Sequence, residues 1–99
     1  MNLDDRNYMI LLYDCYGELF NEKQQEYFES YYFNNLSLGE ISDNIGISRN
    51  AIHKVIKGME EKLIFYEEKL GVLHKNMLIK EIIFSVVDES LKKRLEELV

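Results

Sequence analysis

A single glycine, Gly46, separates two helical patterns near the middle of the chain, and this feature constrains the fold more than any other. Ser37, followed three residues later by Glu40, is the capping-box signature of a helix start, and the apolar stripe behind it stops at Gly46. Ser48 is placed to cap a second helix that extends to Gly71. The spacing predicts a helix of about two turns, a tight turn and a long helix, which is the helix-turn-helix arrangement.

Apolar residues recur where the two helices of this motif have to touch. They are Ile41 and Ile45 in the first helix, Ile47 after the turn, and Ile52 and Val55 in the second. Helices that cross steeply need apolar contacts at the elbow, and they need a glycine where the backbone turns left-handed.

The second helix continues with apolar residues at alternating spacings of four and three, which predicts a buried stripe. These residues are Ile52, Ile56, Met59, Leu63, Tyr66 and Leu70. Gly58 lies within the helix at a cost of about 1 kcal/mol relative to alanine, which indicates close packing or a bend.

The rest of the chain is also predicted to be helical. Its 99 residues include no proline and only five glycines, so it lacks the turn residues that β-rich folds require. Helix boundaries are expected at Asp4 or Asp5, Gly17, Asn21, Asn34 or Asn35, Gly71 and Asp88, and Leu91, Leu95 and Leu98 are expected to face inward in the last helix. We predict an all-α fold of one domain, residues 1–99. A three- or four-helix bundle with a long helix would place the helix-turn-helix core at residues 18–70, and a helical extension would follow at residues 72–99.

Charge is distributed unevenly in this acidic chain. The formal net charge is -6, yet residues 36–58 sum to +1 while the segments before and after sum to -5 and -2. The outward positions at the start of the long helix are polar or basic and never acidic: Ser48, Arg49, Asn50, His53, Lys54 and Lys57. This pattern predicts a nucleic-acid interface. In it, Arg49 and Asn50 would contact base edges, and the serine and lysines would contact phosphates.

A solvated helix face is also polar, and helix-turn-helix units also serve as protein-contact modules, so a protein-binding adaptor stays open as the alternative. Three cations per chain would give a slope of about -3 for the logarithm of the binding constant against the logarithm of the salt concentration. With so few cations, a monomer would bind weakly at physiological salt. A homodimer would double the cation count. The apolar run Met77–Val87 favours a second chain, unless the last helices fold back and bury it.

Other functions have little support in the sequence. Tyr27, Phe28, Tyr31, Tyr32 and Phe33 are the candidates for stacking unpaired bases, but core packing is favoured for them. The two histidines and the single cysteine have no metal-ligand spacing, and no nucleophile motif is present, so we expect no metal, no cofactor and no enzyme activity. No signal pattern or run of about 20 apolar residues occurs, so we expect a cytoplasmic protein without a membrane contact.

Several motifs together resemble the YlxM-like helix-turn-helix proteins of low-GC Gram-positive bacteria and mycoplasmas. They are a Tyr-Gly pair after an apolar helix, "EKQQEY", the paired Tyr31 and Tyr32, "LSLGEI" and "GISRNAIH". The resemblance covers most of the chain and weakens beyond about Leu73. It implies a fold similar to region 4 of bacterial sigma factors, no catalytic activity, and an accessory or regulatory role in the signal recognition particle pathway.

That role would make the particle's RNA or its GTPase a partner in place of a promoter. An α-helix fits the major groove of B-form DNA, whereas A-form RNA hides its major groove, so duplex DNA is favoured and RNA would have to offer a loop or bulge.

Overall fold

The computed structural model describes residues 3–99, which form six α-helices and one short 3-10 helix and contain no strand. The elements are α1 (Leu3–Tyr16), η1 (Gly17–Leu19), α2 (Glu22–Tyr32), α3 (Leu38–Ile45), α4 (Arg49–Leu70), α5 (Val72–Phe84) and α6 (Glu89–Glu96). The prediction of an all-α fold with a long helix after a short one is confirmed.

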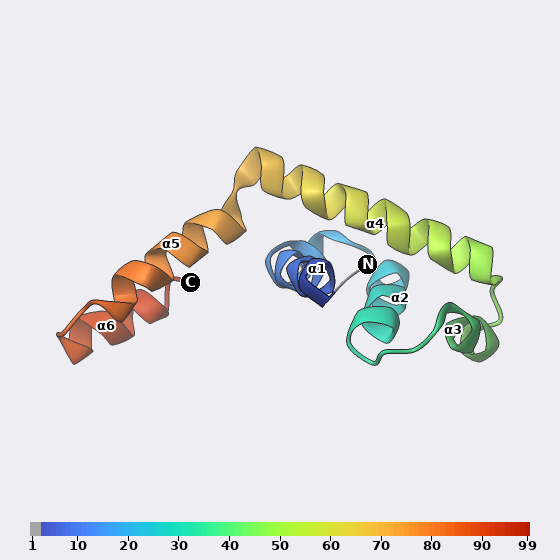
Figure 1. Ribbon diagram of the computed structural model, residues 1–99, viewed down its shortest axis with the longest axis horizontal. Coiled ribbons are helices and arrows are strands. Elements are labelled where there is room, and N and C mark those ends of the chain that lie inside the picture. The colour runs from blue at the N-terminus through green and yellow to red at the C-terminus, as the bar shows by residue number, and fades with distance from the viewer. Residues whose placement is uncertain (1–2) are drawn as a thin grey trace.

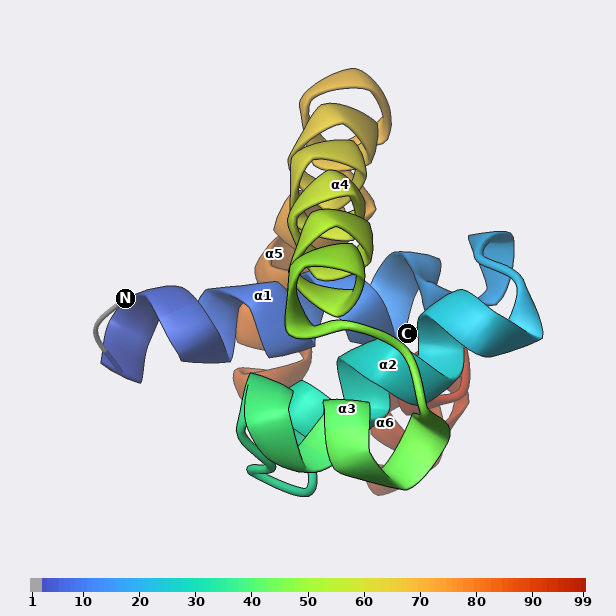
Figure 2. The same cartoon turned by 90° about the vertical axis from the view of Figure 1, so that its right-hand side faces the viewer.

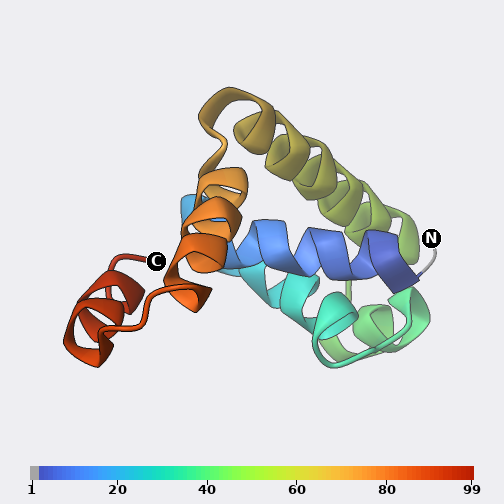
Figure 3. The same cartoon turned by 60° about the vertical axis from the view of Figure 1, so that its left-hand side comes forward.

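The first four helices form a bundle, from which α5 and α6 (residues 72–96) project as an arm. Figure 1 shows α4 along one edge, with α1, α2 and α3 packed beneath it and α5 and α6 continuing past the bundle. The rotated view in Figure 3 shows the same separation of α6 from the first four helices. The radius of gyration is 16.6 Å and the longest extent is 53 Å, whereas a compact chain of this length has a radius of gyration of about 13 Å. The arm accounts for this elongation.

One stripe of α4 forms the centre of the hydrophobic core. Its members Ile52, Ile56, Met59 and Leu63 are all buried. They pack against α1 and α2, which contribute the fully buried Leu12 and Phe28. The spacing prediction is therefore confirmed for four positions. Tyr66 is only half-buried and Leu70 is exposed, because the end of α4 extends past the bundle.

The helix boundaries follow local capping chemistry. The expected capping box of Ser37 with Glu40 is present, and Asn21, an expected helix boundary, forms a second capping box with Gln24. Gly46 ends α3 with a φ of 81°, which a residue with a Cβ adopts only under strain. Ser48, Gly71 and Asp88 also occupy the predicted cap positions. The end of α2 at Tyr32 comes slightly before the expected asparagines.

Two predictions about α1 are wrong. Asp4 and Asp5 lie within its first turn and not at the N-cap position, because the helix already includes Leu3. Gly17 follows the end of α1 as expected, but the left-handed conformation predicted for a glycine that closes the helix is not adopted, since the chain continues directly into η1. A Cβ on Gly17 would come within 3.0 Å of the Tyr13 ring, so the glycine there permits a close approach.

The prediction of close packing at Gly58 is also wrong. No heavy atom lies within 4 Å of the position that its Cβ would take, among the described residues outside the local helix backbone. Figure 1 shows α4 as one helix without a visible bend. Packing and backbone geometry therefore give no reason for a glycine at this position.

The aromatic cluster on α2 belongs mainly to the core, as favoured from the sequence. Tyr27, Phe28 and Tyr32 are buried, and the Phe28 ring stacks on Tyr13 with a centroid separation of 4.2 Å. Phe33 is 42% exposed and follows the last turn of the helix. Base stacking on the three buried rings would require the bundle to open.

A carboxylate holds the junction between α4 and α5. Glu67 accepts hydrogen bonds from the Tyr16 hydroxyl at 2.7 Å and from the amides of Leu73 and His74, both at 3.1 Å. The same hydroxyl accepts a bond from the Val72 amide at 3.0 Å. Burial opposes the charge on Glu67, but its hydrogen bonds outweigh this effect and hold its pKa below the ordinary value.

The arm leaves much apolar surface uncovered. Ile82, Phe84 and Val87 are 61%, 87% and 91% exposed, so the alternative in which the last helices bury this surface internally is wrong. Leu91 and Leu98 were expected to face inward, but both are exposed because α6 packs mainly against α5. No helix among residues 3–99 has the length and apolar character needed to cross a membrane.

Candidate nucleic-acid interface

The helix-turn-helix consists of α3 and the first turns of α4. Ile41 is buried, and Ile45, Ile47 and Val55 are half-buried and pack on the same core. Figure 2 looks toward this end of the molecule, where α3 lies below the start of α4 and a short turn joins them. The apolar elbow therefore fixes the direction in which α4 leaves the turn.

All six residues predicted for the interface are exposed. They are Ser48, Arg49, Asn50, His53, Lys54 and Lys57. At about 100° per residue, the members within the helix span an arc of roughly 140°, to one side of the buried stripe. No other described helix lies over the outer side of α4 in Figures 1 and 3. The structure brings these side chains together on one accessible face, which we call the α4 face.

Two of these residues also have structural contacts. The Ser48 Oγ accepts a hydrogen bond from the Ala51 amide at 3.2 Å, which leaves the hydroxyl proton available to an acceptor. The Arg49 guanidinium lies back over α3, where a Cβ on Gly39 would come within 2.9 Å of Nη2. The first side chain of α4 thus lies against the preceding helix.

The charge of the α4 face changes one turn beyond Lys57. Glu60 and Glu61 come next, and the Glu60 carboxylate accepts a hydrogen bond from the Tyr32 hydroxyl. The acid-free part spans residues 48–57, or about 14 Å of helix at 1.5 Å per residue. This length is comparable with the width of a B-DNA major groove, which is about 12 Å.

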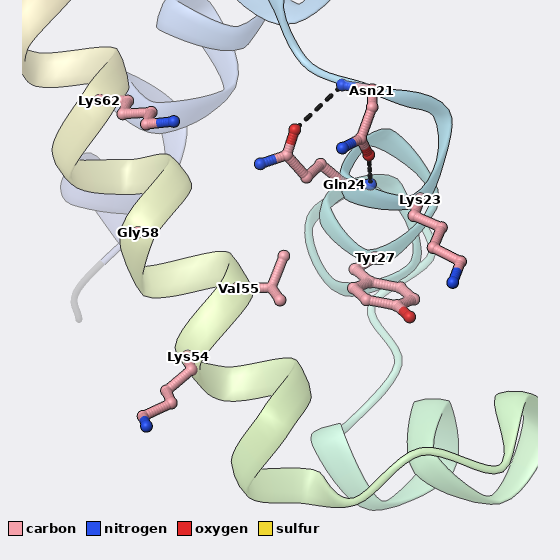
Figure 4. Close-up of a pocket in the computed structure, with 8 residues that line it drawn as sticks. All are labelled: Asn21, Lys23, Gln24, Tyr27, Lys54, Val55, Gly58 and Lys62. Carbon is pink, nitrogen blue, oxygen red and sulfur yellow. Dashed lines mark hydrogen bonds between the residues drawn. The ribbon is translucent and has the colours of Figure 1, made fainter.

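Two further cations, which were not predicted from the sequence, approach this region. Lys23 and Lys62 line a cleft between α2 and α4 together with Lys54, one of the predicted residues (Figure 4). Lys23 lies 31 residues before Lys54 in an acidic stretch, so only the packing of α2 against α4 relates them.

The described part of the chain contains no group of three or more His, Cys, Asp or Glu side chains arranged to hold a metal ion. Cys15 is a half-buried free thiol whose pKa is raised, mainly by burial. It lies on α1, away from the α4 face. The chemistry offered by the α4 face is hydrogen bonding and positive charge.

Comparisons with known proteins agree with this architecture. The family model described as "Putative helix-turn-helix protein, YlxM / p13 like" matches residues 3–99. The UPF0122 protein TTE1463 of Caldanaerobacter subterraneus subsp. tengcongensis is 52% identical over 73 residues, which cover 74% of this chain and 62% of that protein. The UPF0122 protein lwe1821 of Listeria welshimeri is 46% identical over 88 residues, which cover 89% of this chain and 79% of that protein.

The UPF0122 protein Teth514_1714 of Thermoanaerobacter sp. is 49% identical over 76 residues, or 77% of this chain and 65% of that protein. The chain thus spans less than two thirds of the length of the Caldanaerobacter and Thermoanaerobacter relatives that it matches. The match over nearly all residues and these identities lead to one assignment: the chain belongs to the UPF0122 family of YlxM / p13-like helix-turn-helix proteins.

Proposed function

We propose that this chain is a non-enzymatic regulatory protein of the cytoplasm that binds nucleic acid, with duplex DNA as its preferred target, through the α4 face. One observation carries the proposal. In a chain of net charge -6, the exposed residues from Ser48 to Lys57 at the start of a helix-turn-helix second helix include three cations and no acid. The first turns of such a helix are the part that enters a major groove.

Each residue type on the α4 face suits a different contact. Asn50 is well placed for adenine because its amide can donate and accept on one base edge, and Arg49 suits guanine. Ser48, Lys54 and Lys57 suit phosphate oxygens, which fix the position of the helix without reading sequence. His53 lies between these groups as a further hydrogen-bonding side chain.

The affinity of a single chain is expected to be modest. If Arg49, Lys54 and Lys57 together neutralise the charge of three phosphates, the salt slope is about -3, so binding would weaken strongly at physiological salt. A homodimer formed through the exposed apolar surface of α5 and α6 would present two α4 faces and double the cation count. We include this dimer in the proposal.

The resemblance to YlxM-like proteins suggests an accessory or regulatory role in the signal recognition particle pathway. In that role the α4 face would meet an RNA loop or bulge, since side chains cannot read the deep major groove of an RNA helix. The acidic flanks and exposed apolar arm favour a second candidate, an adaptor that binds protein components of the particle directly. Capture of partners from lysate with and without nuclease distinguishes the nucleic-acid-binding protein from the adaptor, because only direct protein contacts survive nuclease treatment.

Fluorescence anisotropy with labelled duplex DNA at low salt tests the proposal. Arg49→Ala combined with Lys54→Ala should abolish binding while helicity and melting temperature stay unchanged, because both side chains are exposed. A matched control is Lys75→Ala with Lys93→Ala, which removes the same charge from the exposed surface of the arm. Equal binding by the two double variants would reject the α4 face as the interface.

A further inference from the structure

A cleft separates the start of α2 from the middle of α4, next to the α4 face. It has a volume of about 390 Å³. Figure 4 shows Lys23 and Gln24 on one side of it and Lys54, Gly58 and Lys62 on the other. The cleft is therefore built from two helices that are far apart in the sequence but held together by the core.

The polar lining of this cleft is positively charged. Three lysines, Lys23, Lys54 and Lys62, contribute to it, and none of the lining residues within 3–99 is acidic. Acids outnumber bases by 18 to 12 in the whole chain, so an acid-free set of three cations departs from the general composition. Lys54 also belongs to the α4 face, which makes the two surfaces continuous.

Two side-chain amides add hydrogen-bond donors at the same edge. The capping box of α2 uses the Asn21 Oδ1 and Gln24 Oε1 atoms as acceptors for backbone amides, at 2.9 and 3.0 Å. The side-chain nitrogens of both residues remain as donors, and Figure 4 shows that of Gln24 directed toward α4. The lining thus offers donors and positive charge, which is the chemistry that binds a phosphate group.

Gly58 provides an independent observation. Glycine is a poor residue for the interior of a helix, and neither φ nor packing requires it here. Gly58 forms part of the cleft wall about one helical turn from both Lys54 and Lys62, so a larger side chain there would take up space at the cleft. A glycine at this position keeps the cleft open.

We propose that this cleft binds a phosphate of the nucleic-acid backbone, so that a strand leaving the α4 face continues between α2 and α4. The inference rests on the proposed function and extends its contact surface from one helix to two. With Lys23 and Lys62 added to the three cations of the α4 face, the salt slope of a single chain rises in magnitude from about 3 to about 5.

The sharpest test introduces an acid at Gly58. Gly58→Glu should weaken binding to duplex DNA on the order of tenfold, because a carboxylate would face the bound phosphate. Gly58→Ala is the matched control, since both substitutions favour the helix and the Cβ that each adds meets no neighbouring atom. Equal affinity of the two variants would overturn the proposal that the cleft binds a phosphate, while the α4 face would remain the proposed interface.

Two further readouts separate this inference from the proposed function. Lys23→Gln with Lys62→Gln should reduce the magnitude of the salt slope by about 2. Titration of the unaltered, isotope-labelled chain with inorganic pyrophosphate should shift the amide resonances of residues 21–24 and 58–62, and Gly58→Glu should remove these shifts. Absence of the shifts would overturn the cleft, whereas absence of any nucleic-acid binding by the unaltered chain would overturn the proposed function itself.

Discussion

The guanidinium group of Arg49 lies against Gly39, so that the first side chain of α4 is supported by the second residue of α3. A Cβ on residue 39 would come within 2.9 Å of Nη2 and 3.1 Å of Nε. The two helices of the motif are therefore in contact beyond the apolar elbow, because the Arg49 side chain of α4 also lies against α3.

Gly39→Ala is expected to displace the Arg49 side chain without harming the fold. Alanine favours a helix over glycine by up to about 1 kcal/mol, and only the flexible end of the arginine has to move. The melting temperature should stay the same or rise slightly, while affinity for duplex DNA falls several-fold. Thermal denaturation and fluorescence anisotropy measure the two effects.

A double-mutant cycle isolates the cause of that loss. In a chain that already carries Arg49→Ala, the Gly39→Ala change should have no further effect on affinity. An equal loss in both backgrounds would show that residue 39 acts independently of the arginine.

Two substitutions of Ser48 distinguish its role as a helix cap from its role in DNA binding. Ser48→Ala removes the side-chain acceptor of the Ala51 amide and should lower the free energy of unfolding by about 1 kcal/mol. Ser48→Asp keeps a capping oxygen but adds an anion to the α4 face, so it should retain stability and lose affinity for DNA. Urea denaturation and anisotropy should therefore rank the two variants in opposite orders, and the same order in both would contradict the assignment.

The Tyr16–Glu67 junction should make part of the stability depend on acid pH. Glu67→Ala is expected to lower the free energy of unfolding by about 2 kcal/mol near neutral pH, because hydrogen bonds to a charged group are lost. The folded-state pKa of Glu67 lies below its ordinary value, so this stabilisation is present above the ordinary pKa of glutamate and is lost as the pH falls through the folded value.

The difference in stability between the unaltered chain and Glu67→Ala should therefore be constant near neutral pH and shrink as the pH falls below the ordinary pKa of glutamate. The exposed neighbour Glu68 gives the control, since Glu68→Ala should change stability little at either pH. A difference that stays constant with pH would contradict the role assigned to the carboxylate.

The exposed apolar surface of the arm predicts self-association. Light scattering at micromolar concentration should report about twice the chain mass of 11.8 kDa. Ile82→Glu places a charge at an exposed apolar position of α5 and should return the chain to a monomer, whereas Lys75→Glu on the same helix should not. A monomer for the unaltered chain would remove the dimer from the account.

The sequence predicted the parts of the fold that depend on local chemistry. The capping residues Asn21, Ser37 and Ser48 and the turn at Gly46 act within a few residues of their position, so short-range patterns identify them. The buried stripe of α4 was likewise readable from its spacing.

Features that depend on distant segments were not predictable in the same way. Tyr16 and Glu67 lie 51 residues apart, and Arg6 donates to the carbonyl of Tyr31 25 residues away, so neither pair leaves a periodic signal. The cleft lysines were missed for the same reason. Gly58 was recognised as unusual, but its place beside the cleft emerged only from the packing of α2 on α4.

The most direct test of the central claim is a titration of the isotope-labelled, unaltered chain with duplex DNA, followed by the shifts of its backbone amide resonances. The account predicts that the largest changes fall on residues 48–57 of the turn and α4. Changes confined to α5 and α6, or no changes at all, would contradict it.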